Sequence, residues 1–157
     1  MMRTAARAAR TVAVVALSAA AAACNTGPAK PAALGGSAEA CRHCRMIVSN
    51  PRFAAQIAAP GEDPVFFDDI GCLSTYLHSA AARPAGSVAY VADHRTGEWV
   101  PAAVAVFTVV PSLETPMGSH VVAHVTAASR DADPSTPGGR AVPLSALFPP
   151  DISEGRR

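Results

Sequence analysis

The sequence has few aromatic residues, a single lysine and no excess of charge of either sign. Aromatic residues make up 5% of the 157 residues, charged residues make up 16%, and the formal net charge is +1. So weak an electrostatic field excludes the class of proteins that bind nucleic acid through a basic surface. One long apolar run is present, at the N-terminus, which excludes a protein with several membrane-spanning helices. The 14 prolines and 11 glycines are spread along the chain, which argues against a long-helix bundle.

The N-terminus has the parts of an export signal. Three arginines without an acidic residue come first, an apolar stretch over residues 11–18 follows, and a run of alanines ends at Cys24. This order is typical of a secretory signal peptide. A cysteine directly after three alanines resembles a bacterial lipobox, which implies that Cys24 carries a lipid. The resemblance implies an exported protein anchored to a bacterial membrane and facing the periplasm, and Asn25 favours the outer membrane.

Three segments follow from this interpretation. Residues 1–23 are predicted to be the lipoprotein signal peptide, residues 24–39 the lipidated cysteine and a flexible tether, and residues 40–150 the folded domain. The tether is rich in Pro, Gly, Ala and Ser and has no apolar period. A secretory signal without lipid or a single membrane helix is the alternative, although the apolar run is shorter than the roughly 20 residues that span a bilayer.

Apolar patterns in the folded part predict an α+β fold with small, mostly antiparallel sheets and one or two helices. A helix is expected to begin after Asp69, a good N-cap residue, and to end before Pro84. A loop is expected over residues 131–139, and a break at residues 84–86 divides the domain into two comparable halves. Strands are expected at residues 46–48, 53–59, 65–67, 87–93, 99–100, 104–110 and 121–126, with a closing strand and turn at residues 141–148.

The chemistry expected of this chain lies in its sulfur atoms. Cys41 and Cys44 form a CxxC motif, and Cys72 lies at the start of the predicted helix. If Cys24 is lipidated, three thiols remain outside the cytoplasm, so at least one of them lies outside any disulfide within the chain. A helix N-terminus favours a thiolate at Cys72, whereas the two aspartates before it oppose one.

Two methionines are further candidate ligands, one close to the CxxC motif and one in a predicted turn. Met46 lies two residues after the CxxC motif, and Met117 lies between Pro116 and Gly118, shortly before His120. Thiolate and thioether are soft donors that select monovalent copper. A structural zinc site needs four Cys or His ligands and gains little from Met. A redox CxxC is expected at a helix start after a buried strand, whereas this one opens the domain.

Each of these residues also has a purely structural interpretation. The CxxC motif of an exported protein can be a simple disulfide, and Met46 beside two apolar residues can belong to the core. Cys72 can be a small buried hydrophobic residue. Asp68 and Asp69 are more typical of a helix cap than of an acid–base pair. We expect the remaining histidines at the solvated surface (His43, His78 and His94) or in packing roles (His120 and His124).

Several short motifs occur in order along the chain: CRHCRMIV at residues 41–48, FAAQI at 53–57, FDDIGCL at 67–73, YVAD at 90–93, EWV at 98–100, TPMG at 115–118 and the glycines at 138–139. Together they resemble the NosL family, whose members are lipoproteins accessory to nitrous oxide reductase. The resemblance covers about residues 40–148 and implies an α+β fold of two related ββαβ-like halves. It implies a copper chaperone rather than an enzyme, with nitrous oxide reductase and a membrane-bound ABC-type maturation complex as partners.

On this resemblance we expect soft ligands for Cu(I) from both parts of the domain. The family usually has glycine immediately before the methionine of its first motif, where this chain has Arg45. A side chain at this position can change the local turn or put a positive charge near the copper site. The geometry and the copper affinity expected at Met46 depend on it. A lipid-anchored thiol–disulfide exchange protein that uses the CxxC pair is the alternative function. The expected primary ligands are Cys44 and Met117, followed by Cys41 and Met46, with Cys72 and His120 as further candidates.

Overall fold

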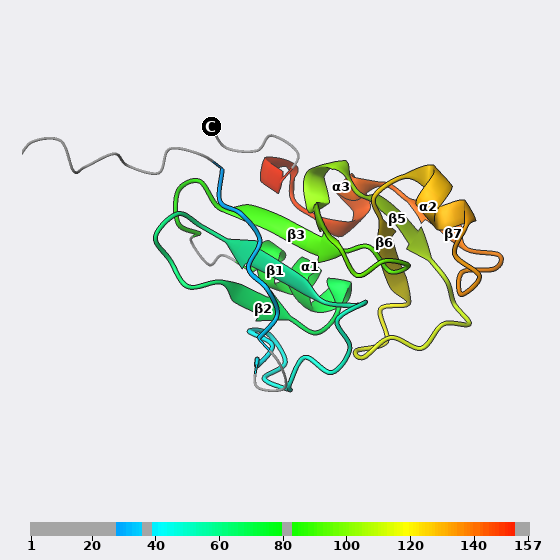
Figure 1. The fold of residues 1–157 in the computed structure, drawn as a ribbon, viewed down its shortest axis with the longest axis horizontal. Coiled ribbons are helices and arrows are strands. Elements are labelled where there is room, and N and C mark those ends of the chain that lie inside the picture. Colours follow the sequence, from blue (N-terminus) through cyan, green and yellow to red (C-terminus); the bar gives the residue numbers. More distant parts are fainter. Residues whose placement is uncertain (1–27, 36–38, 80–82, 153–157) are drawn as a thin grey trace, which may run out of the picture.

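Two short antiparallel sheets and three α-helices make up the part of the chain that the computed structural model describes, residues 28–35, 39–79 and 83–152 (Figure 1). The fold is therefore α+β, as the sequence predicts. The predicted signal peptide and Cys24 lie outside the described residues. Within the described residues, every helix is too short or too polar to cross a membrane.

The first half of the domain has the element order ββαβ. β1 (Ala55–Ala58) pairs antiparallel with both β2 (Val65–Phe67) and β3 (Val88–Ala92), and α1 (Ile70–His78) connects β2 to β3. β4 (Trp99–Pro101) pairs with β3 and completes a sheet of order β2-β1-β3-β4.

The second half repeats the order ββαβ. β5 (Val106–Val109) lies between β6 (Val121–His124) and β7 (Arg140–Val142), and α2 (Ala127–Asp131) precedes β7. The two halves therefore have the related topology that the family resemblance implies. They meet between β4 and β5 rather than at the predicted break at residues 84–86, because β3, which follows that break, pairs with β1. Short helical segments join or follow them: η3 (Ala102–Val104), α3 (Leu144–Leu147) and η4 (Pro150–Ile152).

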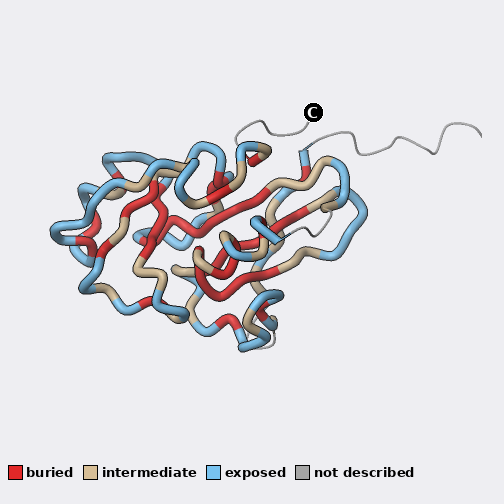
Figure 2. The backbone as a smooth tube through the Cα atoms, turned by 180° about the vertical axis from the view of Figure 1, so that it is seen from behind, coloured by how far each residue is buried: buried red, intermediate tan, exposed pale blue. Residues whose placement is uncertain are grey.

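Helix α1 joins the two halves into one core. Its buried residues Ile70, Leu73 and Leu77 lie at helical spacing and face β1 and β2, and α1 also contacts β6 of the second sheet. The same apolar cluster includes Phe107 from β5 and Phe148, whose rings meet edge to face at 5.5 Å. Burial of such side chains stabilises the fold by about 1.5–3 kcal/mol each. Figure 2 shows the buried backbone running continuously through both sheets.

The two faces of the first sheet are covered by different parts of the chain. Ala89 and Val91 face the α1 core, whereas Tyr90 faces the other side, because successive side chains of a strand point to opposite faces. There the Tyr90 hydroxyl donates a hydrogen bond to the Ala29 carbonyl at 2.7 Å, and the Gln56 amide exchanges two hydrogen bonds with Ala32. Part of the segment predicted as a tether thus lies against this sheet.

Several local predictions differ from the structure. Residues 46–48 form a single bridge, Ile47 with Ala40, rather than a strand. The predicted loop over residues 131–139 is preceded by α2, which begins after Thr126, whose hydroxyl accepts the Ser129 N–H. This helix has five residues, too few to produce a helical period in the sequence. The predicted closing strand and turn at residues 141–148 correspond to β7 and the single helical turn α3.

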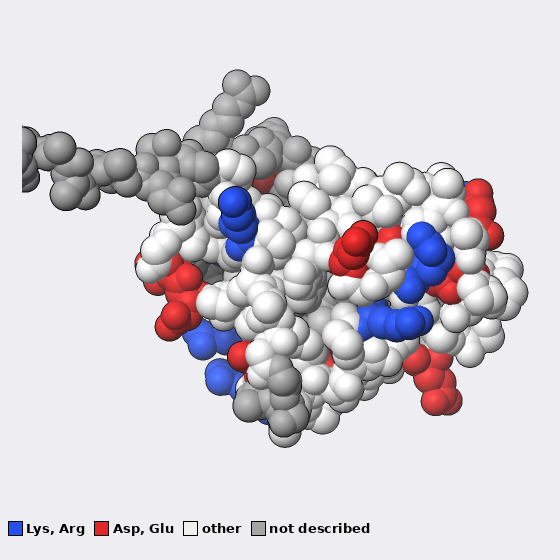
Figure 3. Space-filling model, in the orientation of Figure 1, with Lys and Arg blue, Asp and Glu red and all other residues white. Residues whose placement is uncertain are grey.

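The surface carries few charges. On the face drawn in Figure 3, acidic and basic side chains are interspersed among uncharged residues, so no charge of one sign dominates its described part. The exposed large apolar side chains include both methionines of interest, Met46 and Met117.

Candidate metal site

A tight loop after the first residues of the domain carries the CxxC motif. The Cys41 N–H donates to the Met46 carbonyl at 2.7 Å, and the Arg45 N–H donates back to the Cys41 carbonyl at 3.0 Å. The Arg42 N–H donates to the carbonyl of Phe66 at 2.8 Å, which attaches the loop to β2. The backbone alone therefore fixes both cysteines beside the end of this strand.

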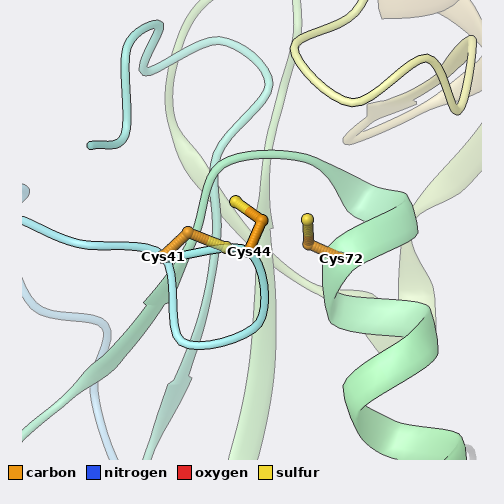
Figure 4. Close-up of side chains that lie close together, drawn as sticks. All are labelled: Cys41, Cys44 and Cys72. Atoms are coloured by element: carbon orange, nitrogen blue, oxygen red, sulfur yellow. The ribbon is translucent and has the colours of Figure 1, made fainter. Parts of the chain in front are cut away.

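Cys72 reaches the same place from helix α1. Asp69 is the N-cap of α1, and its carboxylate accepts the Gly71 N–H, so Cys72 lies in the first turn as predicted. The sulfur atoms of Cys41, Cys44 and Cys72 all lie within 4.8 Å of one another, and all three are free thiols (Figure 4). Sulfur ligands at about 2.3 Å from one ion lie roughly 4 Å apart when three surround it, so small side-chain movements suffice for binding.

The three thiols differ in exposure and in pKa. Burial raises the pKa of the Cys72 thiol, and nearby Cys41 raises it further. The sequence leaves open whether Cys72 is a thiolate at the helix N-terminus or a small buried residue, and its side chain, only 2% exposed, agrees with the second. Burial also raises the pKa of Cys44, which is partly exposed.

Cys41 shows the opposite shift. Burial alone would raise its pKa, but hydrogen bonds from the backbone amides of Cys44, Asp68 and His43 outweigh burial and lower the pKa below its ordinary value. Amide donors stabilise the thiolate form of a cysteine. Cys41 is thus the thiol best prepared to bind a cation as a thiolate.

Arg45 closes the loop in a conformation that favours glycine. Its φ is 68°, in the left-handed region, which costs a residue with a Cβ about 1–2 kcal/mol. The family usually has glycine at this position, and the left-handed conformation explains why, because glycine adopts it without steric cost. The departure at Arg45 therefore introduces backbone strain next to Cys44 and Met46.

The loop that carries Met117 is attached to the N-terminus of α1. The Met117 N–H donates to the Asp69 Oδ2 atom at 3.2 Å. A Cβ added to Gly71 would lie 2.8 Å from the Cβ of Ser119, so this loop packs directly on the first turn of the helix. The structure thus places the backbone of Met117 close to the turn that bears Cys72. The Met117 side chain is 43% exposed.

Met46 and His120 are the other expected copper ligands. Met46 ends the CxxC loop, and its side chain is 47% exposed. The Nδ1 atom of His120 lies 2.8 Å from the Leu113 carbonyl, and His120 is outside the metal-site groups found among the described residues. Copper ligation by Met46, Met117 and His120 remains a prediction.

The model of the NosL family matches residues 32–148, most of the chain. The chain belongs to the NosL family. NosL proteins form a copper-binding accessory family and are not known as enzymes, and the three-cysteine group of this chain fits metal binding. No curated protein matches the sequence.

A second group of potential ligands escaped the sequence analysis. His94, His124 and Asp133 are all buried, and their donor atoms also lie within 4.8 Å of one another. The expectation that His94 lies at the solvated surface is wrong, because its ring packs on Phe53 at 5.0 Å between centroids. The three residues lie up to 39 positions apart and form no sequence motif with a fixed spacing. The sequence could have pointed to the two histidines only through their positions, just after β3 and at the end of β6.

Proposed function

We propose that this NosL protein binds Cu(I) through cysteine and methionine sulfur and delivers it for maturation of the copper site of nitrous oxide reductase. It acts as a lipid-anchored protein that faces the periplasm, with the membrane ABC-type complex as its partner. The convergence of Cys41, Cys44 and Cys72 is the observation that carries this proposal.

The geometry suits temporary binding. Three soft sulfur donors favour Cu(I), which accepts two or three such ligands. Cys44 is the most exposed of the three cysteines, so a ligand from a partner can approach the ion there before the buried thiols release it. The attachment of the Met117 loop to Asp69 brings a thioether-bearing residue to the same end of α1.

Thiol–disulfide exchange fits the site less well. An exchange protein needs an accessible cysteine with a lowered pKa. Here the thiol with the lowered pKa, Cys41, is fully buried, and the pKa of the accessible Cys44 is raised. This inverse relationship favours metal binding. An insulin-reduction assay tests the alternative, which predicts turnover that survives the replacement of Met117.

The test is an anaerobic competition titration of the reduced protein with Cu(I), with Zn(II) as the control ion. We expect one Cu(I) per chain at the sulfur site, and Zn(II) is expected not to displace it. Cys44→Ser and Met117→Ala are expected to weaken Cu(I) binding at least about tenfold while the fold is retained. Val104→Ala is the matched control, because Val104 is an exposed apolar residue outside the site.

A folded, reduced protein that fails to bind Cu(I) would sink the proposal. If Cu(I) binds and Met117→Ala leaves the affinity unchanged, Met117 is removed from the ligand set. Delivery requires a separate measurement, the transfer of copper to the copper-free reductase. Mass spectrometry of the protein from bacterial membranes tests the predicted lipid on Cys24.

A further inference from the structure

Three buried polar residues meet where the two sheets of the domain touch. The Oδ2 atom of Asp133 accepts hydrogen bonds from His94 Nδ1 at 2.7 Å and from His124 Nε2 at 3.0 Å. The exposed fractions are 4% for His94, 0% for His124 and 7% for Asp133. These residues come from the end of β3, the end of β6 and the segment after α2, so the tertiary fold alone brings them together.

The backbone around this group is firmly held. The His94 N–H donates to the Ala123 carbonyl at 2.8 Å, where residues 93 and 123 form a parallel bridge between the sheets. Asp133 uses its other oxygen, Oδ1, to accept the Ser135 N–H at 2.9 Å. Oδ2 therefore accepts from the two imidazoles alone, while the hydrogen bond at Oδ1 helps to hold the carboxylate in its orientation.

We propose that His94, His124 and Asp133 form a second metal site, which takes a divalent borderline ion such as Zn(II) and is independent of the sulfur site. Two imidazoles and a carboxylate are ligands of Zn(II) and related divalent ions, whereas Cu(I) is selected by sulfur. Three protein ligands leave one position of a tetrahedral ion for water.

The donor separations agree with this assignment. Zn(II) binds such nitrogen and oxygen atoms at about 2.0–2.2 Å, which places tetrahedral ligands about 3.4 Å apart. The observed separations of 2.7 and 3.0 Å need to widen only slightly. On binding, the ion takes the place of the two N–H groups at Oδ2, and each neutral ring then carries its one proton on its other nitrogen.

An ion can reach the group from the surface. Asp133 lines a hollow with a volume of about 440 Å³, which is also bordered by Thr108, Arg130, Thr136 and Gly138. Asp133 is the member of the group that borders this hollow, so the hollow is the side from which an ion would approach. The cysteine thiols do not border this hollow, so the two sites load through different parts of the surface.

The first test uses Co(II) as a spectroscopic probe that replaces Zn(II). We expect one equivalent to bind to the reduced protein with the visible spectrum of nitrogen and oxygen ligation, without thiolate-to-cobalt charge transfer. Asp133→Asn and His94→Gln are expected to weaken this binding at least about 100-fold. His78→Gln is the matched control, because His78 is an exposed histidine on α1.

The second test uses the unaltered protein, so its result does not depend on the folding of a variant. In the unaltered protein, Zn(II) is expected to shift the ring nitrogen resonances of His94 and His124 and to leave those of His78 in place. Unchanged resonances in the folded protein, or Co(II) bound through thiolate alone, would overturn the proposal. Cu(I) loading of the sulfur site is measured separately, so failure of one site leaves the result for the other intact.

Discussion

Asp69 connects the helix that bears Cys72 to the loop that bears Met117. One carboxylate oxygen, Oδ1, accepts the Gly71 N–H and caps α1, while the other, Oδ2, accepts the Met117 N–H at 3.2 Å. Asp69 is itself fully buried, so the link is shielded from water. The conformation of the Met117 loop is thus coupled to the first turn of the helix.

Asp69→Asn separates the two roles of this carboxylate. Asparagine caps a helix about as well as aspartate, so the cap to Gly71 is expected to survive. Its side-chain NH2 group cannot accept the Met117 N–H, so the loop loses its attachment. We expect the free energy of unfolding to fall by about 1–2 kcal/mol, because the Met117 amide is left unpaired, and the Cu(I) affinity to fall.

Asp69→Ala, which removes both bonds, is the comparison and is expected to cost more stability. Equal Cu(I) affinity in all three proteins would show that the attachment does not position a copper ligand.

Gly71 allows the loop and the helix to meet. In Gly71→Ala the new Cβ would lie 2.8 Å from the Cβ of Ser119, so the loop is expected to move away and stability to fall by about 1–3 kcal/mol. Ser119→Gly removes the opposing carbon, and the double variant is expected to recover part of the loss. Chemical denaturation of the four proteins gives the coupling energy, and strictly additive effects would contradict the contact.

Arg45→Gly is expected to relieve strain in the CxxC loop. The left-handed φ of 68° costs arginine about 1–2 kcal/mol, part of which the greater entropy of unfolded glycine offsets. We therefore expect a net stabilisation of roughly 0–1 kcal/mol, measured by denaturation. The matched control is Arg42→Gly in the same loop, where φ is not positive and glycine is expected to destabilise. A loss of stability in Arg45→Gly equal to that of Arg42→Gly would contradict the strain.

Asp93 makes the stability of the domain sensitive to acid. Burial alone would raise its pKa, but hydrogen bonds from the Val125, Thr96 and Arg95 amides and the Ser129 hydroxyl hold the pKa below its ordinary value. Such a group stabilises the fold above its unfolded pKa of about 4, and the contribution is lost as the pH falls through the folded value.

Asp93→Asn is accordingly expected to lower the free energy of unfolding by about 2–3 kcal/mol at pH 7, since buried donors lose a charged acceptor. The loss of stability on acidification below pH 4 is expected to become shallower, which thermal unfolding across pH measures. Asp131→Asn is the control, because Asp131 pairs with Arg130 at the exposed surface. A parallel pH profile for Asp93→Asn and the unaltered protein would contradict this role.

Local patterns in the sequence were sufficient for several features of the fold. Asp69 before an apolar helical period predicted the start of α1, and the apolar run at residues 87–93 predicted β3. The CxxC motif predicted that the thiols of Cys41 and Cys44 lie close together. These features depend on neighbours within a few positions, where helix capping and strand alternation operate.

The tertiary structure decided what depends on distant partners. The sequence left a thiolate and a buried thiol at Cys72 as alternatives, and burial under the domain core determined its raised pKa. It assigned His94 to the surface, but the bridge between the two sheets enclosed it with His124 and Asp133. Sequence spacing determines which residues share a turn or a strand face. Which thiols and imidazoles meet depends on how two sheets and a helix pack, because only packing brings together donors that lie far apart in the chain.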